Sequence, residues 1–301
     1  MSARTGWYLV PLAALAALAG CALPPAAGPA ATELRLTCPT ARAEVPNADY
    51  VGRYAGVENA IPLQELAQDI HCSDTFKARL FPAGFVTIYG SSRIQPCRPN
   101  STDCEDATNA ANDALYASVR RFAQAWTTRY GRKHPIMTGA GPGLMEAGNR
   151  GAKDAGGPSV GYTTYYDSVP NPNPNADPAR PYGGKPGLAL NPYVSNGLIF
   201  SSVAMREQAM IKHSAAIVIG PGGTGTEWEL FQIVETLKSR QLARVPVYLV
   251  GNRQLHWRSL EQRLADMVAR KTVRREEVAF LKFAENDEDL LRQLAADLGL
   301  N

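Results

Sequence analysis

The chain has 301 residues, of which 45% are apolar and 20% are charged. This length and composition suffice for one large or two small domains with a buried core. The 31 basic and 28 acidic side chains give a net charge of +3. That balance excludes a strongly basic nucleic-acid binder and a highly charged disordered chain. Five cysteines are an odd number, so at least one of them has no partner within the chain.

Residues 1–20 have the pattern of a secretory signal. One charge, Arg4, precedes an apolar run, and small residues come directly before Cys21. The run is too short for a membrane span, and the Leu-Ala-Gly-Cys sequence that ends it resembles the lipobox of bacterial lipoproteins. We expect cleavage before Cys21 and lipidation of this cysteine; the alternative is an ordinary cleaved signal or a buried N-terminal helix. The protein is then exported and anchored on the periplasmic side, and the outer membrane is favoured because no acidic residue follows the cysteine.

The other four cysteines form an even set, which fits an oxidising compartment. Of the three ways to pair them we favour Cys97–Cys104, which are close in sequence, with Cys38–Cys72; four free thiols are the alternative. No Cys-x-x-Cys or His-Glu-x-x-His spacing predicts a metal site. Residues 21–32 are rich in Ala and Pro and predict a flexible tether between the lipid and the fold.

Residues 33–83 have a mixed pattern with a helix indicated near 63–70, and we treat them as an N-terminal extension. In residues 84–301, strand and helix patterns alternate and are joined by short glycine-rich loops. This alternation predicts an α/β fold with a parallel sheet covered by helices on both faces. Residues 169–186, rich in Pro and Asn, predict an irregular lid or rim loop. Strands are expected at 85–89, 134–138, 159–162, 216–219 and 245–250, and helices at 107–130, 144–155, 203–213, 227–240, 257–269 and 287–298.

Three loops with glycine follow predicted strands. The carboxyl ends of parallel strands converge on one crevice, where glycine amides and helix N-termini favour an anion. A phosphate-bearing ligand is the inference, and simple tight turns are the alternative. The third loop lacks the lysine of a P-loop, and neither glycine loop has the G-x-G-x-x-G register of a dinucleotide site. The loops are Gly90-Ser91-Ser92-Arg93, Gly139-Ala140-Gly141-Pro142-Gly143 and Gly222-Gly223-Thr224-Gly225-Thr226.

Residues 221–229, Pro-Gly-Gly-Thr-Gly-Thr-Glu-Trp-Glu, match the PGGxGTxxE signature of the Lonely Guy (LOG) family, some of whose members were long mislabelled lysine decarboxylases. Residues 138–152 resemble its second glycine motif, and residues 191–194 with Met205-Arg206 resemble its larger bacterial branch. The resemblance covers about residues 84–250. It implies a Rossmann-like fold, a homodimer and a phosphoribohydrolase without metal or organic cofactor. Such enzymes hydrolyse the N-glycosidic bond of nucleoside 5′-monophosphates such as AMP or cytokinin riboside monophosphates.

The resemblance places the catalytic pair at Arg206 and Glu229. Arg206 stands fifteen residues before Pro221, Glu229 is the last acid of the signature, and Met210 fits a methionine of the family. A plain structural ion pair is the alternative for Arg206 and Glu229. The resemblance further implies substrate or phosphate binding by Gly90, Ser91, Ser92, Gly139, Gly141, Gly143, Met145, Gly222, Gly223, Thr224, Gly225 and Thr226.

Several features depart from the family pattern. Glu207 stands where the family has a lysine, and we expect it to point outward to solvent. Ala140 replaces a frequent glycine, which costs little where its φ is negative. Trp228 either stacks on a base or packs against the sheet. Because the family is mostly cytoplasmic and this chain reads as exported, the alternative function is a non-catalytic envelope sensor of nucleotides or phosphoribose.

Overall fold

The computed structural model describes residues 36–39, 45, 47–53, 58–166, 187–188 and 190–300. The expected signal segment 1–20, the lipidation site Cys21, the tether 21–32 and the Pro/Asn-rich stretch 169–186 lie outside the described residues. Among the residues that are described, no helix is both long enough and apolar enough to cross a bilayer.

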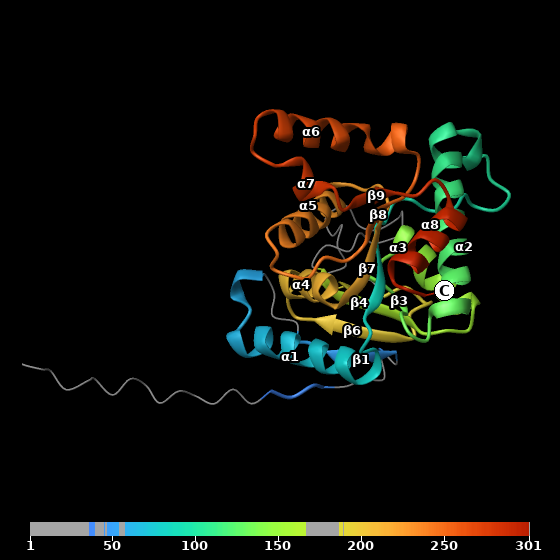
Figure 1. The fold of residues 1–301 in the computed structure, drawn as a ribbon. Coiled ribbons are helices and arrows are strands. Elements are labelled where there is room, and N and C mark those ends of the chain that lie inside the picture. Colours follow the sequence, from blue (N-terminus) through green and yellow to red (C-terminus); the bar gives the residue numbers. More distant parts are fainter. Residues whose placement is uncertain are drawn as a thin grey trace, which may run out of the picture. The chain divides into compact units, whose positions relative to one another are not determined.

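A parallel sheet of eight strands forms the centre of the described fold (Figure 1). The strands lie in the order β1-β6-β4-β3-β2-β7-β8-β9, and each neighbouring pair is parallel. A two-residue strand, β5 (Gly187–Leu188), pairs antiparallel with the end of β4. The eight strands are β1 (Ala48–Val51), β2 (Phe85–Tyr89), β3 (Ile136–Thr138), β4 (Ser159–Tyr166), β6 (Asn196–Phe200), β7 (Ser214–Ile219), β8 (Val247–Leu249) and β9 (Leu281–Phe283).

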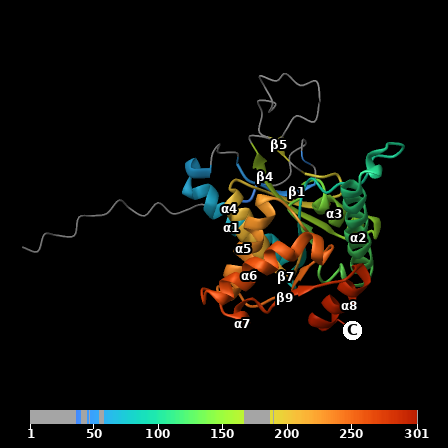
Figure 2. The ribbon, with the colours of Figure 1, turned by 90° about the horizontal axis from the view of Figure 1, so that it is seen from above.

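Helices cover both faces of this sheet (Figure 2). One face carries α1, α4, α5, α6 and α7, and the other carries α2, α3 and α8. The predicted Rossmann-like α/β class is therefore confirmed. The helices are α1 (Leu63–Leu80), α2 (Ala107–Tyr130), α3 (Leu144–Asp154), α4 (Val203–His213), α5 (Thr224–Lys238), α6 (Arg258–Ala269), α7 (Arg275–Val278) and α8 (Asp287–Asp297).

The central strand β2 contributes to a hydrophobic core on each face. Phe85 and Tyr89 belong to the core beneath α1, α4 and α5, whereas Val86 and Ile88 belong to the core beneath α2 and α3. Successive side chains of a strand point to opposite faces, so this short apolar run serves both cores. A continuous run of buried residues is what a central strand of a parallel sheet requires.

The long helix α2 has the bounds that its sequence predicts. The Asp106 side chain accepts a hydrogen bond from the Asn109 amide and so caps the helix N-terminus. At the other end, the Gly131 amide donates to the carbonyl of Thr127. The apolar residues that repeat at helical spacing are all buried, and they are Leu115, Val119, Phe122 and Trp126.

The N-terminal extension contributes β1 and α1 to the same sheet and core as the later residues. β1 pairs with β6 at one edge of the sheet, and α1 packs against α4. Asp69 on α1 is fully buried and accepts hydrogen bonds from the amides of Ser201 (2.9 Å) and Ser202 (3.0 Å) and from the Tyr50 hydroxyl (2.8 Å). Glu58 accepts from the first two amides of α4, at 3.0 and 3.2 Å. Two carboxylates of the extension thus bind the N-terminus of α4, where negative charge is favourable.

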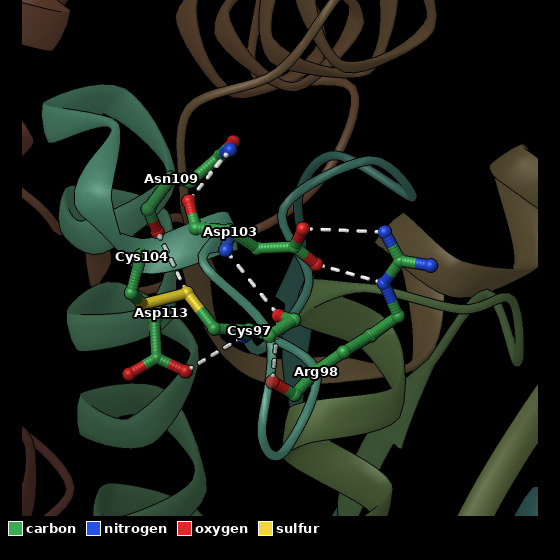
Figure 3. A network of polar contacts seen from close by, with 7 residues as sticks. Cys97, Arg98, Asp103, Cys104, Asn109 and Asp113 are labelled. Atoms are coloured by element: carbon green, nitrogen blue, oxygen red, sulfur yellow. Dashed lines mark hydrogen bonds and ion pairs between the residues drawn. A yellow bond between two sulfur atoms is a disulfide. The ribbon is translucent and has the colours of Figure 1, made fainter.

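Two disulfides, Cys38–Cys72 and Cys97–Cys104, are the pairs that the sequence favoured. Figure 3 shows the second one beside α2, where Asp113 accepts a hydrogen bond from the Cys97 amide at 2.9 Å and Arg98 pairs with Asp103 at 2.7 Å. The ligand-type atoms of Cys97, Cys104 and Asp113 lie within 4.8 Å of one another. Because both sulfurs are in the disulfide, they are not thiolate ligands for a metal.

Replacing both cysteines of the Cys38–Cys72 disulfide by serine is expected to lower the free energy of unfolding by about 4 kcal/mol, against about 2 kcal/mol for Cys97–Cys104. The first bridge joins residues 34 apart and the second joins residues 7 apart, so the first restricts the unfolded chain more. Denaturant titrations of the wild type and both double variants without reductant would measure this. A larger loss for the shorter loop would contradict it.

Candidate functional site

A cavity of about 780 Å³ lies where the loops after β2, β3 and β7 meet. These strands are neighbours in the sheet, so their carboxyl ends converge as the sequence indicated. Two residues proposed for binding, Gly143 and Gly222, do not line it. The other candidate residues do line it, and they are Gly90, Ser91, Ser92, Gly139, Gly141, Met145, Gly223, Thr224, Gly225, Thr226, Arg206 and Glu229. The lining is completed by Arg93, Pro142, Val203, Glu207 and Trp228.

Gly143 and Gly222 support the loops instead of facing the cavity. A Cβ atom on Gly143, whose φ is +73°, would lie 2.3 Å from the carbonyl oxygen of Ser91. The next amide, that of Leu144, donates to the same oxygen at 3.1 Å. A Cβ on Gly222 would lie 2.2 Å from the Thr226 hydroxyl oxygen. Glycine at position 143 lets two backbone segments approach closely, and glycine at position 222 leaves room for the Thr226 side chain.

Gly143→Ala is expected to lower the free energy of unfolding by about 3 kcal/mol, since it adds a backbone collision to an unfavourable positive φ. Gly156→Ala is the matched control, because Gly156 has a φ of +69° but no atom within 4 Å of its Cβ position. This control substitution is expected to lower the free energy of unfolding by about 1 kcal/mol. Thermal and denaturant unfolding of the two variants would measure the difference, and equal losses would contradict the proposed loop contact.

The second glycine loop is held by buried amide side chains. Ala140 has a φ of +60°, so the expectation of a negative φ there was wrong. The loop keeps this conformation because the Ala140 amide donates to the Thr138 hydroxyl at 2.9 Å and its carbonyl accepts from the Asn191 amide at 2.8 Å. The Asn191 side chain also donates to the side-chain oxygen Oδ1 of Asn149 at 2.9 Å. These asparagines lie within the family motifs, yet their spacing alone does not show that they meet.

Arg206 on α4 reaches the cavity from beneath the second glycine loop. Its side chain is almost fully buried, and its Nη1 donates to the Tyr162 carbonyl at 3.3 Å. A Cβ on Gly139 would lie 2.7 Å from this Nη1, so the glycine leaves room for the guanidinium. Arg206 Nη2 lies 3.9 Å from a carboxylate oxygen of Glu229 on α5 and bonds directly to Glu207.

Glu207 points inward, so the expectation of an outward position was wrong. It is 1% exposed and lines the cavity. The cause is the packing of α4 between α1 and the sheet, which leaves only Gln208 and Lys212 of this helix exposed. One carboxylate oxygen of Glu207 and the Nε of Arg206 have no hydrogen-bond partner among the described residues. An acceptor and a donor in the buried wall are therefore left unsatisfied.

Burial dominates the electrostatics around Glu229. It raises the pKa of this carboxyl to about 7, while Arg206 acts in the opposite direction. Burial, together with the nearby Glu229, also raises the pKa of the Tyr89 phenol well above its usual range. The Tyr89 hydroxyl has no hydrogen-bond partner among the described residues. The buried, neutral phenol of Tyr89 thus lies near Arg206 and Glu229, and no motif in the sequence indicated it.

The N-terminus of α5 lies in the cavity lining. The helix begins at Thr224, three residues earlier than predicted, and no side chain caps its N-terminus. Thr224 and Thr226 in its first turn line the cavity together with Ser91 and Ser92, and the free amides of a helix N-terminus favour an anion. Trp228 is 46% exposed on the cavity wall, so it does not serve the sheet packing.

The strand order, the helix layers and the cavity define a Rossmann-like α/β protein with a cavity at the carboxyl ends of its strands. Residues 145–294 match the family model described as "Possible lysine decarboxylase". This part of the chain therefore belongs to that family, which is the LOG-like family that the two glycine motifs indicated. No curated protein matches the sequence.

The solved structures to which this chain is similar are distant in sequence. The molybdenum cofactor binding protein of Rippkaea orientalis is 14% identical over 71% of this chain and 96% of its own, with a TM-score of 0.43. The molybdenum cofactor carrier protein of Chlamydomonas reinhardtii is 14% identical over 72% of this chain and 99% of its own, with a TM-score of 0.45. The fold class rests on the strand order and helix layers of the chain itself.

Proposed function

We propose that this chain hydrolyses the N-glycosidic bond of nucleoside 5′-monophosphates and releases a free base and ribose 5-phosphate. The observation that carries the proposal is that Arg206 and Glu229 line the same cavity as the uncapped N-terminus of α5. One cavity therefore combines a place for a phosphate with a carboxyl group that can act on the sugar. The family of residues 145–294 supports the same class of reaction.

The cavity supports a defined orientation of the nucleotide. The phosphate binds the amides and hydroxyls of Thr224 and Thr226, where the helix dipole favours an anion. Arg93 lies exposed in the same lining and adds a positive charge at the cavity mouth. The half-exposed Trp228 provides an aromatic surface for the base. The ribose then lies between these groups, within reach of Glu229.

The chemistry requires stabilisation of positive charge on the ribose. As the C1′–N bond breaks, its electron pair leaves with the base and the sugar becomes oxocarbenium-like. A carboxylate at Glu229 stabilises this charge and orients the water that adds to C1′. The positive charge of Arg206, 3.9 Å from a carboxylate oxygen of Glu229, favours the ionised form of this carboxyl. The water proton is taken up by the carboxylate or the departing base, so the products are base and ribose 5-phosphate.

The test is incubation of the purified protein with AMP and a panel of other nucleoside 5′-monophosphates, with release of free base measured by liquid chromatography. We expect base release from monophosphates and little from the matching nucleosides, because these lack the group that binds the α5 N-terminus. One observation favours a second candidate function, a non-catalytic sensor of nucleotides or phosphoribose. The Arg206 guanidinium is already paired with the Glu207 carboxylate. Binding by calorimetry without base release from any monophosphate would establish the sensor and refute the hydrolase.

We also propose that the protein is exported and lipid-anchored through Cys21. The two disulfides support this, since such bonds persist in oxidising compartments. Mass spectrometry of the membrane fraction tests it: the expected N-terminus is a lipid-modified Cys21, and retention of residues 1–20 would refute it. The homodimer that the resemblance implies stays a prediction, which light scattering would test.

A further inference from the structure

Three buried ionisable side chains lie together in the cavity wall. Two of them are carboxyl groups, and one arginine is the cation beside both. The side chains of Arg206, Glu207 and Glu229 are 6%, 1% and 14% exposed. Arg206 Nη2 bonds directly to Glu207, whereas its distance of 3.9 Å to the nearest oxygen of Glu229 is too long for a hydrogen bond. Among the described residues of the cavity lining, Arg206 is the buried cation, and Glu207 holds it.

Other charged or titratable groups near Glu229 do not take the place of Arg206 as its ion-pair partner. Tyr89 on β2 stays neutral because its pKa is raised well above its usual range. Arg93, in the loop after β2, is exposed, so solvent screens its charge. On α5 itself, Glu227 pairs with Arg263 of α6 at 3.6 Å, and both are about half-exposed. Besides burial, the charge state of Glu229 therefore depends on how closely Arg206, which bonds to Glu207, approaches it.

An arginine that is bonded to a carboxylate forms a pair with no net charge. A third buried group beside this pair meets a weak field, so burial decides its protonation. Had Arg206 bonded to Glu229 instead, the direct ion pair would have held Glu229 ionised. The raised pKa of Glu229, about 7, agrees with the arrangement that the contacts show.

We propose that Glu207 is a positioning residue that holds Arg206 and thereby lets Glu229 bind a proton near neutral pH before substrate binds. The consequence for catalysis rests on the proposed function. The Glu229 proton passes to the leaving nitrogen of the base as the C1′–N bond breaks and its electron pair goes to the base. The resulting carboxylate stabilises the ribosyl cation and then accepts a proton from the water that adds to C1′. Glu229 is protonated again at the end, and one water is consumed.

The direct test measures Glu229 in the ligand-free protein, independently of any activity. Carbon-13 NMR of glutamate-labelled protein follows the side-chain carboxyl resonances with pH, and Glu229→Gln identifies the one that belongs to Glu229. We expect this carboxyl to titrate near pH 7 in the wild type. In Glu207→Gln, Arg206 is free to bond Glu229, so the midpoint is expected to fall by at least about one pH unit. A second variant, Glu207→Ala, gives the same shift if the first does not fold.

The matched control is Glu227→Gln, which removes a carboxylate from the same helix without touching Arg206. It is expected to move the Glu229 midpoint by only a few tenths of a unit, about the effect of an exposed charge. A wild-type midpoint near the ordinary glutamate value would overturn the proposal. So would a midpoint that is unchanged in both Glu207 variants, or one that moves equally in the control.

The activity readout separates this proposal from the proposed function. If the wild type releases base, kcat is expected to fall above about pH 7, and in Glu207→Gln the fall is expected about one pH unit lower with KM unchanged. Lowering the pH then rescues the variant, which a merely structural defect would not allow. If no base is released at all, the hydrolase assignment fails while the NMR titration still decides the role of Glu207.

Discussion

Glu229→Gln is expected to reduce base release by about 10³-fold or more, with the fold and nucleotide binding retained. Glutamine has nearly the same shape but supplies neither the proton nor the negative charge that cleavage of the C1′–N bond requires. The residue lies in the cavity wall, and its side chain is only 14% exposed, so no solvent group replaces it easily. Base release under saturating substrate measures the effect, and turnover equal to the wild type would refute the catalytic role.

The same substitution is expected to raise the free energy of unfolding at pH 8 by about 1–3 kcal/mol. Burial raises the folded pKa of Glu229 to about 7, above the reference value of 4.5. Between these values the folded protein keeps a proton that the unfolded chain has lost, so stability falls as pH rises from about 4.5 to 7 and the loss is complete above 7. Glutamine carries no such penalty. Urea titrations at pH 5 and pH 8 would show the gain at pH 8 and little at pH 5; Glu227→Gln is the control, with no comparable gain.

Much of the fold is predictable because its main elements are long or strongly patterned. α2 and α4 have the predicted bounds, since apolar residues recur at helical spacing along them. The edge strands β1 and β9 were not predicted, because a charged residue, Asp49 or Lys282, interrupts each of these short apolar runs. β6, Asn196–Phe200, was also missed; its first two residues, Asn and Gly, are typical of turns.

The meeting of the three glycine loops was predictable, because parallel strands bring their carboxyl ends together whatever the loop sequence. The inward direction of the Glu207 side chain was not predictable. Whether one helical residue is exposed or buried depends on what packs against each side of the helix. α4 lies between α1 and the sheet, and α1 comes from a segment whose pattern is mixed. The positive φ of Ala140 was not predictable either, because it depends on Asn191, which lies 51 residues away in the sequence.

Asp69→Ala is expected to lower the free energy of unfolding by about 5 kcal/mol and to reduce activity in the protein that still folds. The substitution leaves three donors without an acceptor: the Tyr50 hydroxyl and the amides of Ser201 and Ser202. Asp69 is fully buried, so water does not readily take its place. Because Ser202 is the N-cap of α4, the loss also loosens the helix that carries Arg206.

Glu65→Ala provides the comparison, since Glu65 lies one turn earlier on α1 and is only half-buried. Glu65→Ala is expected to lower the free energy of unfolding by less than about 1 kcal/mol. Denaturant titration gives the stability of each variant, and nucleotide binding at a temperature where each is folded gives the effect on the site. Equal stability losses would show that Asp69 is an ordinary helix residue. A larger loss for Asp69→Ala with weakened binding would show that the N-terminal extension holds the α4 end of the cavity in place, because Asp69 contributes no atom to the cavity lining.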